Sequence, residues 1–392
     1  MMVSKSSICI LTTVSASIKA FYKGQLEALK QAGFDITVIC ANDEELNNQL
    51  PENIKFYPVP FSRVISPFGD IIAVLKLIHI FRKERFDIVQ YSTPKASLLG
   101  SIASFFARVP IRIYILWGLY YAGQFGFKRF LFKSFEKIIC KLSNKIIPIS
   151  LEMVDFALSE GLGKREKYEV MLNGSACGVD LELFDPEKWK NYRGKIRDQY
   201  HLPENATIIG TVARLTGDKG INELVQAFDI LSNESPRMYL LLVGEEEEKN
   251  KLDGDTVSII MRNNRIRCAG WQNNPLPYYA AMDIFCLPTY REGFGEVNLE
   301  AQAMELPVIS TNTIGPRESV EDGITGFLVK SQSSEALLEP LRKLICQSEL
   351  RIKMGKAGRQ RVINKFDRKE MIKAVVEHRL KLISELRIKW AV

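Results

Sequence analysis

The chain of 392 residues lacks any charge-free run long enough to cross a bilayer. Its longest charge-free stretches are two runs of 15 residues, Ile113–Phe127 and Cys268–Met282, whereas a spanning helix needs about 20 mostly apolar residues. We therefore expect no transmembrane helix. The apolar run Ile8–Val14 is short and is interrupted by two threonines, so we interpret it as a buried first strand rather than as the core of a signal peptide.

Cysteine and histidine are scarce. The seven cysteines form no CxxC pair, and their odd number is typical of reduced thiols in a cytosolic setting. The sequence therefore predicts neither a zinc site nor a disulfide framework. The three histidines, His79, His201 and His378, all fall outside the ends of the expected strands, which argues against a Ser-His-Asp hydrolase.

Two glycine motifs are absent. The chain has no GxxxxGK[ST] sequence, and no glycine lies between Thr12 and Lys23, where a GxGxxG motif would have to follow the first strand. Both motifs shape backbone that cradles the phosphates of a nucleotide. Their absence excludes a P-loop and disfavours a nicotinamide-dependent oxidoreductase.

What the chain does have is an ordinary globular composition with an uneven charge. Apolar residues make up 46% and charged residues 25% of the chain, values typical of a protein with a packed core. The net charge is +7, and +6 of it falls in residues 1–180, where 22 Lys and Arg oppose 16 Asp and Glu. A basic surface attracts phosphate-rich partners and anionic membranes, so we expect such a partner for the first half of the chain.

Short apolar runs alternate with helical patterns along the chain. Strands without polar alternation, separated by helices, predict a parallel sheet covered on both faces. The first expected strands are Ile8–Thr13, Asp35–Cys40, Ile54–Val59, Phe86–Tyr91, Ile111–Leu116 and Lys145–Ile149. The pattern restarts with Thr207–Val212, Tyr239–Val243, Arg265–Cys268, Ile284–Leu287, Pro307–Ser310 and Gly326–Val329. Expected helices include Phe21–Ala32, Asp70–Glu84, Ala96–Arg108 and Lys128–Leu142.

We therefore predict an α/β protein with two doubly wound, Rossmann-like domains that face each other across a cleft. The predicted boundaries are residues 1–180 for the N-terminal domain, 181–205 for a linker and 206–370 for the second domain. Residues 371–392 are predicted to form a C-terminal helix that packs back on the N-terminal domain. Ligands of such sheets bind beyond the carboxyl ends of the strands, so the loops at these ends are the expected places for chemistry.

One strand-end segment combines glycines with acidic residues. After the strand Ile284–Leu287 come Gly293 and Gly295, and then the start of a helix. Glycines let the backbone approach a ligand, and the free N–H groups of a helix start favour an anion. Glu292 and Glu300, eight positions apart, can border one diphosphate-sized pocket and accept hydroxyl hydrogen bonds from a sugar and a ribose. The same pattern is also typical of any helix whose first turn carries favourable acidic residues.

A second strand-end segment carries positive charge. Arg214 follows the strand Thr207–Val212, and Lys219 follows a short loop that contains Gly217. Arg binds a planar oxyanion with two hydrogen bonds and Lys adds a point charge, so the segment is a candidate phosphate clamp. The alternative is an exposed basic loop. The segment 253–255 has the spacing of a metal-binding DxD motif, but its polar surroundings favour a turn, and no metal site is predicted.

Together the two segments resemble those of the retaining, nucleotide-sugar-dependent glycosyltransferases of family 4, which have the GT-B fold. The signature is an E-x7-E pair, here Glu292 and Glu300. The further matches, in chain order, are Asn173–Phe184, Arg214, Lys219, Asp283–Pro288 and Gly315–Val329. The resemblance covers nearly the whole chain and is strongest from residue 207 to residue 329.

The resemblance implies a retaining hexosyltransferase that moves a hexose or N-acetylhexosamine-type sugar from a nucleotide sugar, with a UDP-sugar favoured, and needs neither a metal nor a cofactor. Arg214 and Lys219 would hold the donor diphosphate, and Glu300 would bind the ribose. Glu292 would hold the transferred sugar and phosphates together with the neighbouring backbone. The catalytic candidates are thus Glu292, Arg214 and Lys219, and the donor-binding candidates are Gly293, Phe294, Gly295, Glu300 and Trp271.

One feature departs from the family. Many members carry a histidine in the N-terminal domain that contacts the donor sugar. The matching stretches here, Asp87–Lys95 and Ile115–Gly118, contain no histidine. Either this chain does without that contact or its donor differs.

The acceptor side also carries a resemblance. The stretch Thr93–Gly100 resembles a subgroup of the family that acts on polyprenyl-diphosphate-linked saccharides in bacterial surface-glycan assembly, as in a capsule or an O-antigen. This resemblance implies a lipid-linked saccharide as the acceptor. The acceptor-side candidates are Thr93, Lys95 and Trp117.

The residues around the fifth expected strand are unusually aromatic. Residues 114–135 hold nine aromatic residues in 22 positions, against 38 in the whole chain. In the expected helix Lys128–Leu142, lysines alternate with Phe and Ile, a pattern typical of an interfacial helix. The alternative is a core helix with a solvated basic face. The sequence thus predicts an anionic membrane surface as a partner, and a cytoplasmic protein that is peripheral on the inner face of the plasma membrane.

Other functions share parts of this pattern. A transferase with a soluble acceptor would need the same donor site, and lipid dependence would separate the two hypotheses. A sugar-nucleotide 2-epimerase of similar fold would convert the nucleotide sugar without an acceptor, but it has no need for the E-x7-E loop. Nucleic acid is not an expected partner, because no binding motif accompanies the basic first half.

Overall fold

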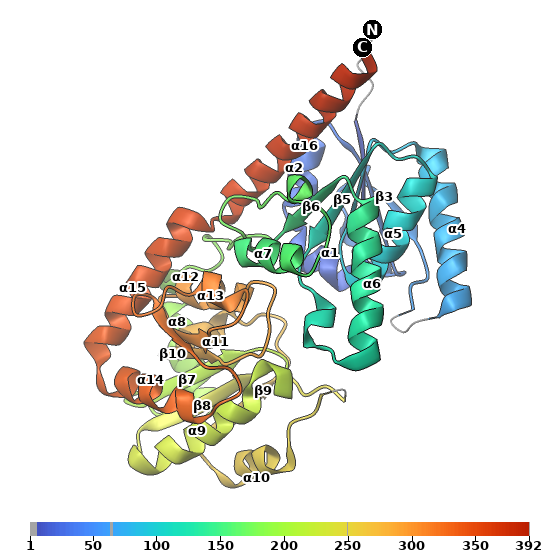
Figure 1. Ribbon diagram of the computed structural model, residues 1–392. Coiled ribbons are helices and arrows are strands. Elements are labelled where there is room, and N and C mark those ends of the chain that lie inside the picture. Colours follow the sequence, from blue (N-terminus) through green and yellow to red (C-terminus); the bar gives the residue numbers. More distant parts are fainter. Residues whose placement is uncertain (1–5, 63–65, 249, 392) are drawn as a thin grey trace. The chain divides into compact units, whose positions relative to one another are not determined.

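The computed structural model describes residues 6–62, 66–248 and 250–391 (Figure 1). The chain forms two compact units: unit 1 contains residues 1–177 and 369–392, and unit 2 contains residues 178–368. In the described residues each unit has one six-stranded, parallel sheet. The predicted α/β class with two doubly wound sheets is confirmed.

The strands of both sheets are apolar because helices cover the sheets on both faces. The order in unit 1 is β3-β2-β1-β4-β5-β6, and the order in unit 2 is β12-β11-β10-β7-β8-β9. The predicted strands are confirmed to within two residues at either end. Those of unit 1 are β1(Ser7–Leu11), β2(Asp35–Cys40), β3(Lys55–Pro58), β4(Ile88–Tyr91), β5(Ile111–Leu116) and β6(Lys145–Pro148). Those of unit 2 are β7(Thr207–Val212), β8(Met238–Val243), β9(Ile266–Gly270), β10(Ile284–Leu287), β11(Val308–Thr311) and β12(Gly326–Val329).

Three helices of unit 1 lie side by side: α4 (Pro67–Glu84), α5 (Pro94–Phe106) and α6 (Gly126–Leu142) (Figure 1). Helix α5 packs against both of the others. The other helical elements before the crossing to unit 2 are α1(Ser15–Phe21), α2(Gln25–Gln31), α3(Glu44–Gln49), η1(Tyr120–Gly123), α7(Leu151–Ser159) and η2(Arg165–Lys167).

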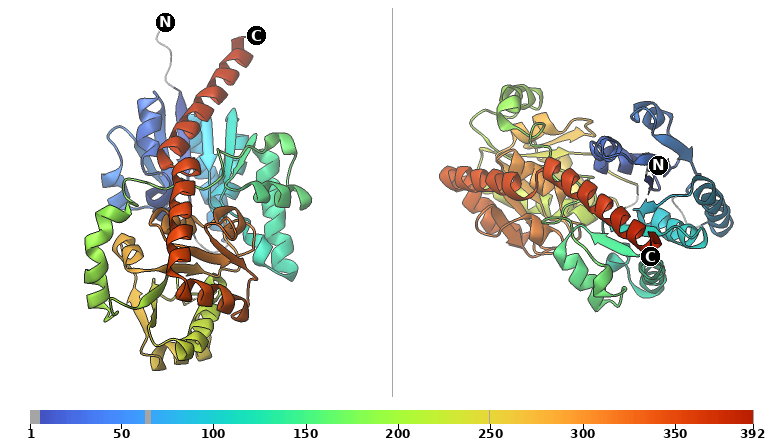
Figure 2. Two further views of the ribbon diagram at one scale, coloured as in Figure 1. Left: turned by 90° about the vertical axis from the view of Figure 1, so that its left-hand side faces the viewer. Right: turned by 90° about the horizontal axis from the view of Figure 1, so that it is seen from above.

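The long helix α16 (Arg368–Ala391), red in Figures 1 and 2, completes unit 1. Its Leu382 and Ile383 are buried in a cluster with residues of α1, α2 and the sheet. Its Arg379 side chain is 1% exposed and donates to the Gln90 amide oxygen from Nε at 3.0 Å and from Nη2 at 2.5 Å. The helix therefore joins the core of unit 1 through both apolar and polar contacts.

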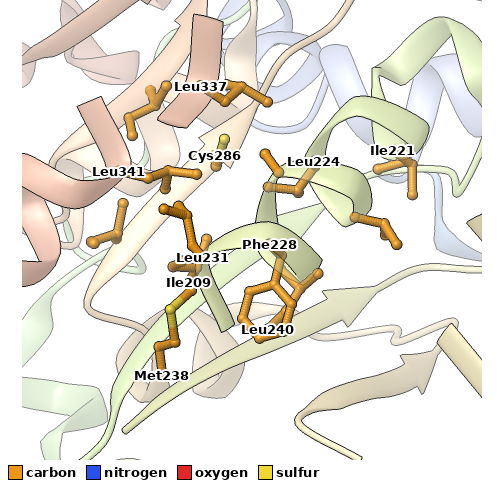
Figure 3. Close-up of a cluster of buried hydrophobic side chains, with 14 of the residues drawn as sticks. Ile209, Ile221, Leu224, Phe228, Leu231, Met238, Leu240, Cys286, Leu337 and Leu341 are labelled. Atoms are coloured by element: carbon orange, nitrogen blue, oxygen red, sulfur yellow. The ribbon is translucent and has the colours of Figure 1, made fainter. Parts of the chain in front are cut away.

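The core of unit 2 lies between its sheet and two amphipathic helices. Phe228 and Leu231 of α9 (Ile221–Glu234) meet Leu337 and Leu341 of α14 (Glu335–Cys346) over the strands, as Figure 3 shows. The remaining helical elements are α8(Pro186–Gln199), η3(Gly217–Lys219), α10(Gly254–Arg262), α11(Leu276–Ala281), α12(Glu296–Ala303), α13(Pro316–Ser319) and α15(Ser348–Lys365).

The structure differs from the expected organisation at two places. Residues 181–205, expected as a linker, lie inside unit 2 and contain helix α8. The helix expected over Phe21–Ala32 begins only at Gln25, as α2, because Gly24 adopts a φ of +78° between the end of α1 at Phe21 and the start of α2.

No helix in the described part of the chain is both long enough and apolar enough to cross a bilayer.

Candidate active site

The two chemically promising loops of unit 2 are neighbours in space. Strand β7 is central, with β8 and β9 on one side and β10, β11 and β12 on the other. The winding direction therefore reverses between β7 and β10, and ligands of open α/β sheets bind at such a reversal, beyond the carboxyl ends of the strands. Arg214 and Lys219 follow β7, and Glu292 follows β10.

Direct contacts tie these loops together. The backbone N–H of Tyr290 donates to the Asp218 carbonyl at 2.9 Å, and the Thr289 hydroxyl donates to the same carbonyl at 3.1 Å. The Lys219 ammonium forms an ion pair with the Glu292 carboxylate, and both side chains are largely buried. Two of the predicted catalytic residues are thus in contact.

One glycine permits this close approach. Gly220 has a φ of +72°, and a Cβ at this position would lie 2.0 Å from the Pro288 carbonyl oxygen. Only glycine fits a left-handed conformation with backbone this close. The loop after β7 can therefore lie directly against the end of β10.

Positive charge gathers around Asp218. Burial disfavours ionisation of this carboxyl, but a hydrogen bond from Thr216 and the nearby charges of Lys219, Arg214 and Arg291 hold its pKa below the usual value. The Arg214 guanidinium also donates to Glu247 at 2.6 Å and is nearly half exposed. The cations needed for an anionic ligand are present, and carboxylates hold them in place.

The second glutamate of the E-x7-E pair has a different environment. Glu300 lies on α12, and its Oε2 accepts a hydrogen bond of 2.9 Å from the Tyr279 hydroxyl. Burial raises the pKa of Glu300, although the Tyr279 hydrogen bond and the Arg368 charge act in the opposite direction. Its Oε1 accepts no hydrogen bond from the described residues, so this oxygen can accept from a ligand hydroxyl.

The remaining donor-side candidates have different surroundings. Gly293 and Gly295 lie in the loop before α12, where Gly295 caps the helix with a φ of +96°. The Phe294 side chain is 1% exposed and packs on Phe366, so only its backbone can meet a ligand. Trp271, after β9, is 63% exposed, and its indole N–H donates to Asn273.

The acceptor-side candidates belong to unit 1. Its winding direction reverses between β1 and β4, and the loops that follow these strands meet where the Thr93 and Thr13 hydroxyls are 2.7 Å apart. Thr93 has a φ of +69°, an unusual conformation for a β-branched residue. Lys95 forms an ion pair of 2.7 Å with Asp70.

Trp117 lies in another part of unit 1. Its ring centroid is 4.5 Å from that of Phe21. It lines a cavity of about 30 Å³ with Gln25, Gln90 and Arg379 among other residues.

Sequence reasoning missed Asp218, Glu247 and Tyr279. Asp218 lies between Arg214 and Lys219 in the candidate phosphate clamp. Glu247 belongs to the four glutamates 245–248 that follow β8. The strand-end rule would have found both. Tyr279 comes from a short helix, and nothing in its local sequence predicts a contact with Glu300.

No group of three or more His, Cys, Asp or Glu side chains within the described ranges is arranged to hold a metal. Asp253, of the DxD spacing, accepts a hydrogen bond from the Thr256 N–H and caps α10. The segment expected as a turn is therefore the N-cap and the start of helix α10, of which Gly254 and Asp255 are the first residues.

Known proteins resemble both units. Residues 193–361 match the family described as glycosyl transferases group 1, and residues 7–150 match the one described as glycosyl transferase 4-like. The capsular polysaccharide biosynthesis glycosyltransferase CapM of Staphylococcus aureus is 37% identical over 91% of this chain and 92% of its own length. A UDP-Gal:alpha-D-GlcNAc-diphosphoundecaprenol alpha-1,3-galactosyltransferase of Escherichia coli is 27% identical over 88% of each chain.

A solved structure shares the fold. The HepE protein of Anabaena, in complex with UDP and glucose, matches with a TM-score of 0.77 and 21% identity over 95% of this chain and 99% of that chain. This likeness confirms the GT-B fold, and the relatives above confirm the resemblance drawn from Glu292 and Glu300. With paired cations and acids at the strand reversal of unit 2 and matching relatives along nearly its whole length, the chain belongs to the group 1, family 4-like glycosyltransferases.

Proposed function

We propose that this glycosyltransferase moves a hexose or an N-acetylhexosamine-type sugar from a nucleotide sugar, with a UDP-sugar favoured, to a lipid-linked saccharide with retention of configuration. The observation that carries the proposal is the cluster of Lys219, Glu292, Asp218 and Arg214 at the strand reversal of unit 2. The proposed setting is bacterial capsule or polysaccharide biosynthesis, and it is supported by the name of the S. aureus relative.

The cluster suits the departure of a nucleoside diphosphate. Negative charge grows on the diphosphate as the bond to the sugar breaks, and positioned cations stabilise that charge. The donor diphosphate would replace Glu292 as the partner of Lys219 and Glu247 as the partner of Arg214. Glu292, released from Lys219, would then accept hydrogen bonds from the sugar hydroxyls, and Glu300 would bind the ribose through Oε1.

Independence from a metal is part of the proposal. Arg214 and Lys219 together offer two positive charges, which is the charge that a divalent cation would bring to the diphosphate. Transfer is therefore expected to continue in the presence of a chelator.

A lipid-linked acceptor is supported by two observations. The E. coli relative is named for a diphosphoundecaprenol-linked acceptor. The Thr93–Lys95 segment follows β4 at the strand reversal of unit 1, where ligands of such sheets bind.

An anionic membrane surface is the proposed partner of unit 1. Lys128, Lys137 and Lys141 of α6 are exposed, as the interfacial helix requires. Arg129 and Lys133, by contrast, contact Glu160 at 2.9 and 2.6 Å. The attraction to anionic lipids therefore rests on the three exposed lysines.

The test is the transfer of radiolabel from a panel of UDP- and GDP-sugars into solvent-extractable lipid, with purified protein and bacterial membranes. Label in the lipid from one donor, with or without a chelator, supports the proposal and names the sugar. Label only in a water-soluble acceptor would contradict the lipid acceptor and keep the donor site.

Variants of the clamp locate the donor site. Removing Lys219 or Arg214 should lower kcat/KM about 100-fold, as the loss of a charge-stabilising group does in other enzymes. The matched control is Lys356→Ala, which removes an exposed lysine on α15 of the same unit. Wild-type rates in Lys219→Ala and Arg214→Ala would place the site elsewhere.

A further inference from the structure

Helix α4 is apolar on two faces. Ala73, Leu77, Ile80 and Phe81 are buried against unit 1, as the core requires. On another face, four large apolar side chains at helical spacing are 59 to 85% exposed: Phe68, Ile71, Ile72 and Leu75. A helix that is apolar all round is normally covered all round, and an exposed apolar patch of this kind marks an interaction surface.

Helix α6 exposes apolar side chains at the same place along its length. Phe125, which caps the helix, is 88% exposed, Phe127 is 75% exposed and Phe130 is 69% exposed. All three belong to the cap or the first turns. The exposed aromatic residues of α6 are thus concentrated where the helix begins.

Both helices become basic further along. On α4 the exposed apolar residues are followed by exposed Lys76, Arg82 and Lys83. On α6 exposed Lys128 lies among the aromatic residues of the first turn, and exposed Lys137 and Lys141 follow them. The apolar and basic parts therefore succeed each other along α4 and, apart from Lys128, whose long stem can carry its ammonium toward the headgroups, along α6. In a helix that lies flat on a membrane, they would occupy opposite sides.

The two apolar ends point the same way. Helix α4 follows β3 and α6 follows β5, so each begins at the carboxyl edge of the parallel sheet, with α5 packed between them (Figure 1). At 1.5 Å per residue, the exposed residues Phe68 to Leu75 extend about 10 Å along the axis. This length matches the depth of roughly 5–10 Å to which interfacial helices bury apolar side chains.

We propose that unit 1 dips into an anionic bilayer end-on, with the first halves of α4 and α6 inserted as two prongs and their basic second halves at the lipid headgroups. The proposal rests on the proposed function and adds how the membrane is engaged. It replaces the flat interfacial helix expected from the sequence of α6 alone.

The proposal also places the acceptor loop. Helix α5 begins with Pro94 between the two prongs, so Thr93 and Lys95 lie at the same edge of the sheet. A diphosphate attached to a lipid sits at the headgroups. Insertion of the prongs would bring that diphosphate to the Thr93–Lys95 segment without lifting the lipid out of the bilayer.

Charge favours lipid over a second copy of the chain. Two copies that met through the apolar ends would leave the basic second halves of α4 and α6 without an anionic partner. Anionic headgroups have the opposite sign and neutralise the same residues.

Co-sedimentation with vesicles of phosphatidylcholine and phosphatidylglycerol tests the prongs. Ile72→Glu and Phe127→Glu are each expected to weaken vesicle binding about tenfold, because a charge replaces an inserted apolar group. The matched control is Phe106→Glu, a residue 57% exposed at the far end of α5, and it should bind like the wild type. Equal binding by all three variants would overturn the proposal. So would a dimer, detected by analytical ultracentrifugation, that Ile72→Glu dissociates.

Conservative variants give a readout that does not depend on a new charge. The fluorescence of the tryptophan introduced by Phe68→Trp or Phe127→Trp should be quenched by lipids brominated in the acyl chain. The fluorescence of the tryptophan introduced by Phe106→Trp should not be quenched. Each variant is compared with the wild-type protein. Quenching in none of the three would mean that binding is superficial and would overturn insertion.

The experiments distinguish a failure of the insertion proposal from a failure of the proposed function. Vesicle binding and quenching need no substrate, whereas transfer to a short-chain, water-soluble acceptor needs no vesicle. A wild-type protein that transfers sugar in solution but shows no insertion would overturn only this inference.

Discussion

Among single side chains, Glu300 has a pKa that should be visible in the kinetics. Burial raises that pKa above its usual value, and only the ionised form accepts hydrogen bonds with both oxygens. Lowering the pH should therefore raise KM for the donor at pH values where an exposed glutamate, with a pKa of about 4.3, would still be ionised. Initial rates measured against donor concentration across the acidic range check this.

The matched variant is Glu300→Gln, whose side chain keeps its size and does not ionise. Its KM for the donor should be higher at neutral pH and should not change in the range where the wild type does. A parallel change in both proteins would assign the pH dependence to another group.

The side chains of the candidate site were only partly predictable from the sequence. Glu292, Glu300, Arg214 and Lys219 were found because strand ends and motif spacing are local features. Their partners Glu247 and Tyr279 come from the loop after β8 and from helix α11. The sheet order that brings these elements together cannot be predicted from the spacing of residues within one segment. Phe294 lies within the motif, yet its ring serves the core.

Among loops and helices, the contact between the loop after β7 and the end of β10 depends on Gly220. Gly220→Ala would place a methyl group 2.0 Å from the Pro288 carbonyl oxygen at a φ of +72°, so the loops must separate. We expect a loss of stability of about 1–3 kcal/mol and a fall in kcat/KM of at least tenfold, measured by thermal unfolding and initial rates.

The control for Gly220 is Gly194→Ala. Gly194 lies within helix α8, and nothing lies within 4 Å of the position that its Cβ would occupy. Alanine there should stabilise the protein by about 0.5–1 kcal/mol. Similar effects of the two substitutions would show that contact with Pro288 has no part in the result.

The strands were predictable and helix α8 was not, because sequence reasoning recognises elements by their apolar pattern. Strands buried on both faces are continuous apolar runs, which are easily recognised. Helix α8 has little apolar periodicity, because it is held by ion pairs of Arg193 and Arg197 with Asp283, at 2.6 and 2.8 Å, as well as by apolar contacts. A polar segment that is held by arginine ion pairs has the composition of a linker, and the sequence therefore predicted one.

For the chain as a whole, the buried contact between Arg379 and Gln90 joins residues that are 289 positions apart. Arg379→Met would leave the buried Gln90 oxygen without a partner and lower the stability of unit 1 by about 1–3 kcal/mol. Arg379→Met combined with Gln90→Leu should recover most of the loss, because the unpaired Gln90 oxygen is then absent and the Tyr22 hydroxyl, which loses Gln90, keeps Ser92 as a partner. Scanning calorimetry of the single and double variants checks this, and a double variant no more stable than Arg379→Met would contradict it.

The same contact has a consequence for the order of assembly during synthesis. The last strand of unit 1 is complete at Pro148, yet Arg379, Leu382 and Ile383 follow the whole of unit 2 in the chain. Domains emerging from the ribosome begin to fold from the N-terminus. Nascent unit 1 must therefore wait, with one surface uncovered, while all of unit 2 is translated. Unit 2, although it is the second unit to begin, is thus complete in the chain before unit 1 is.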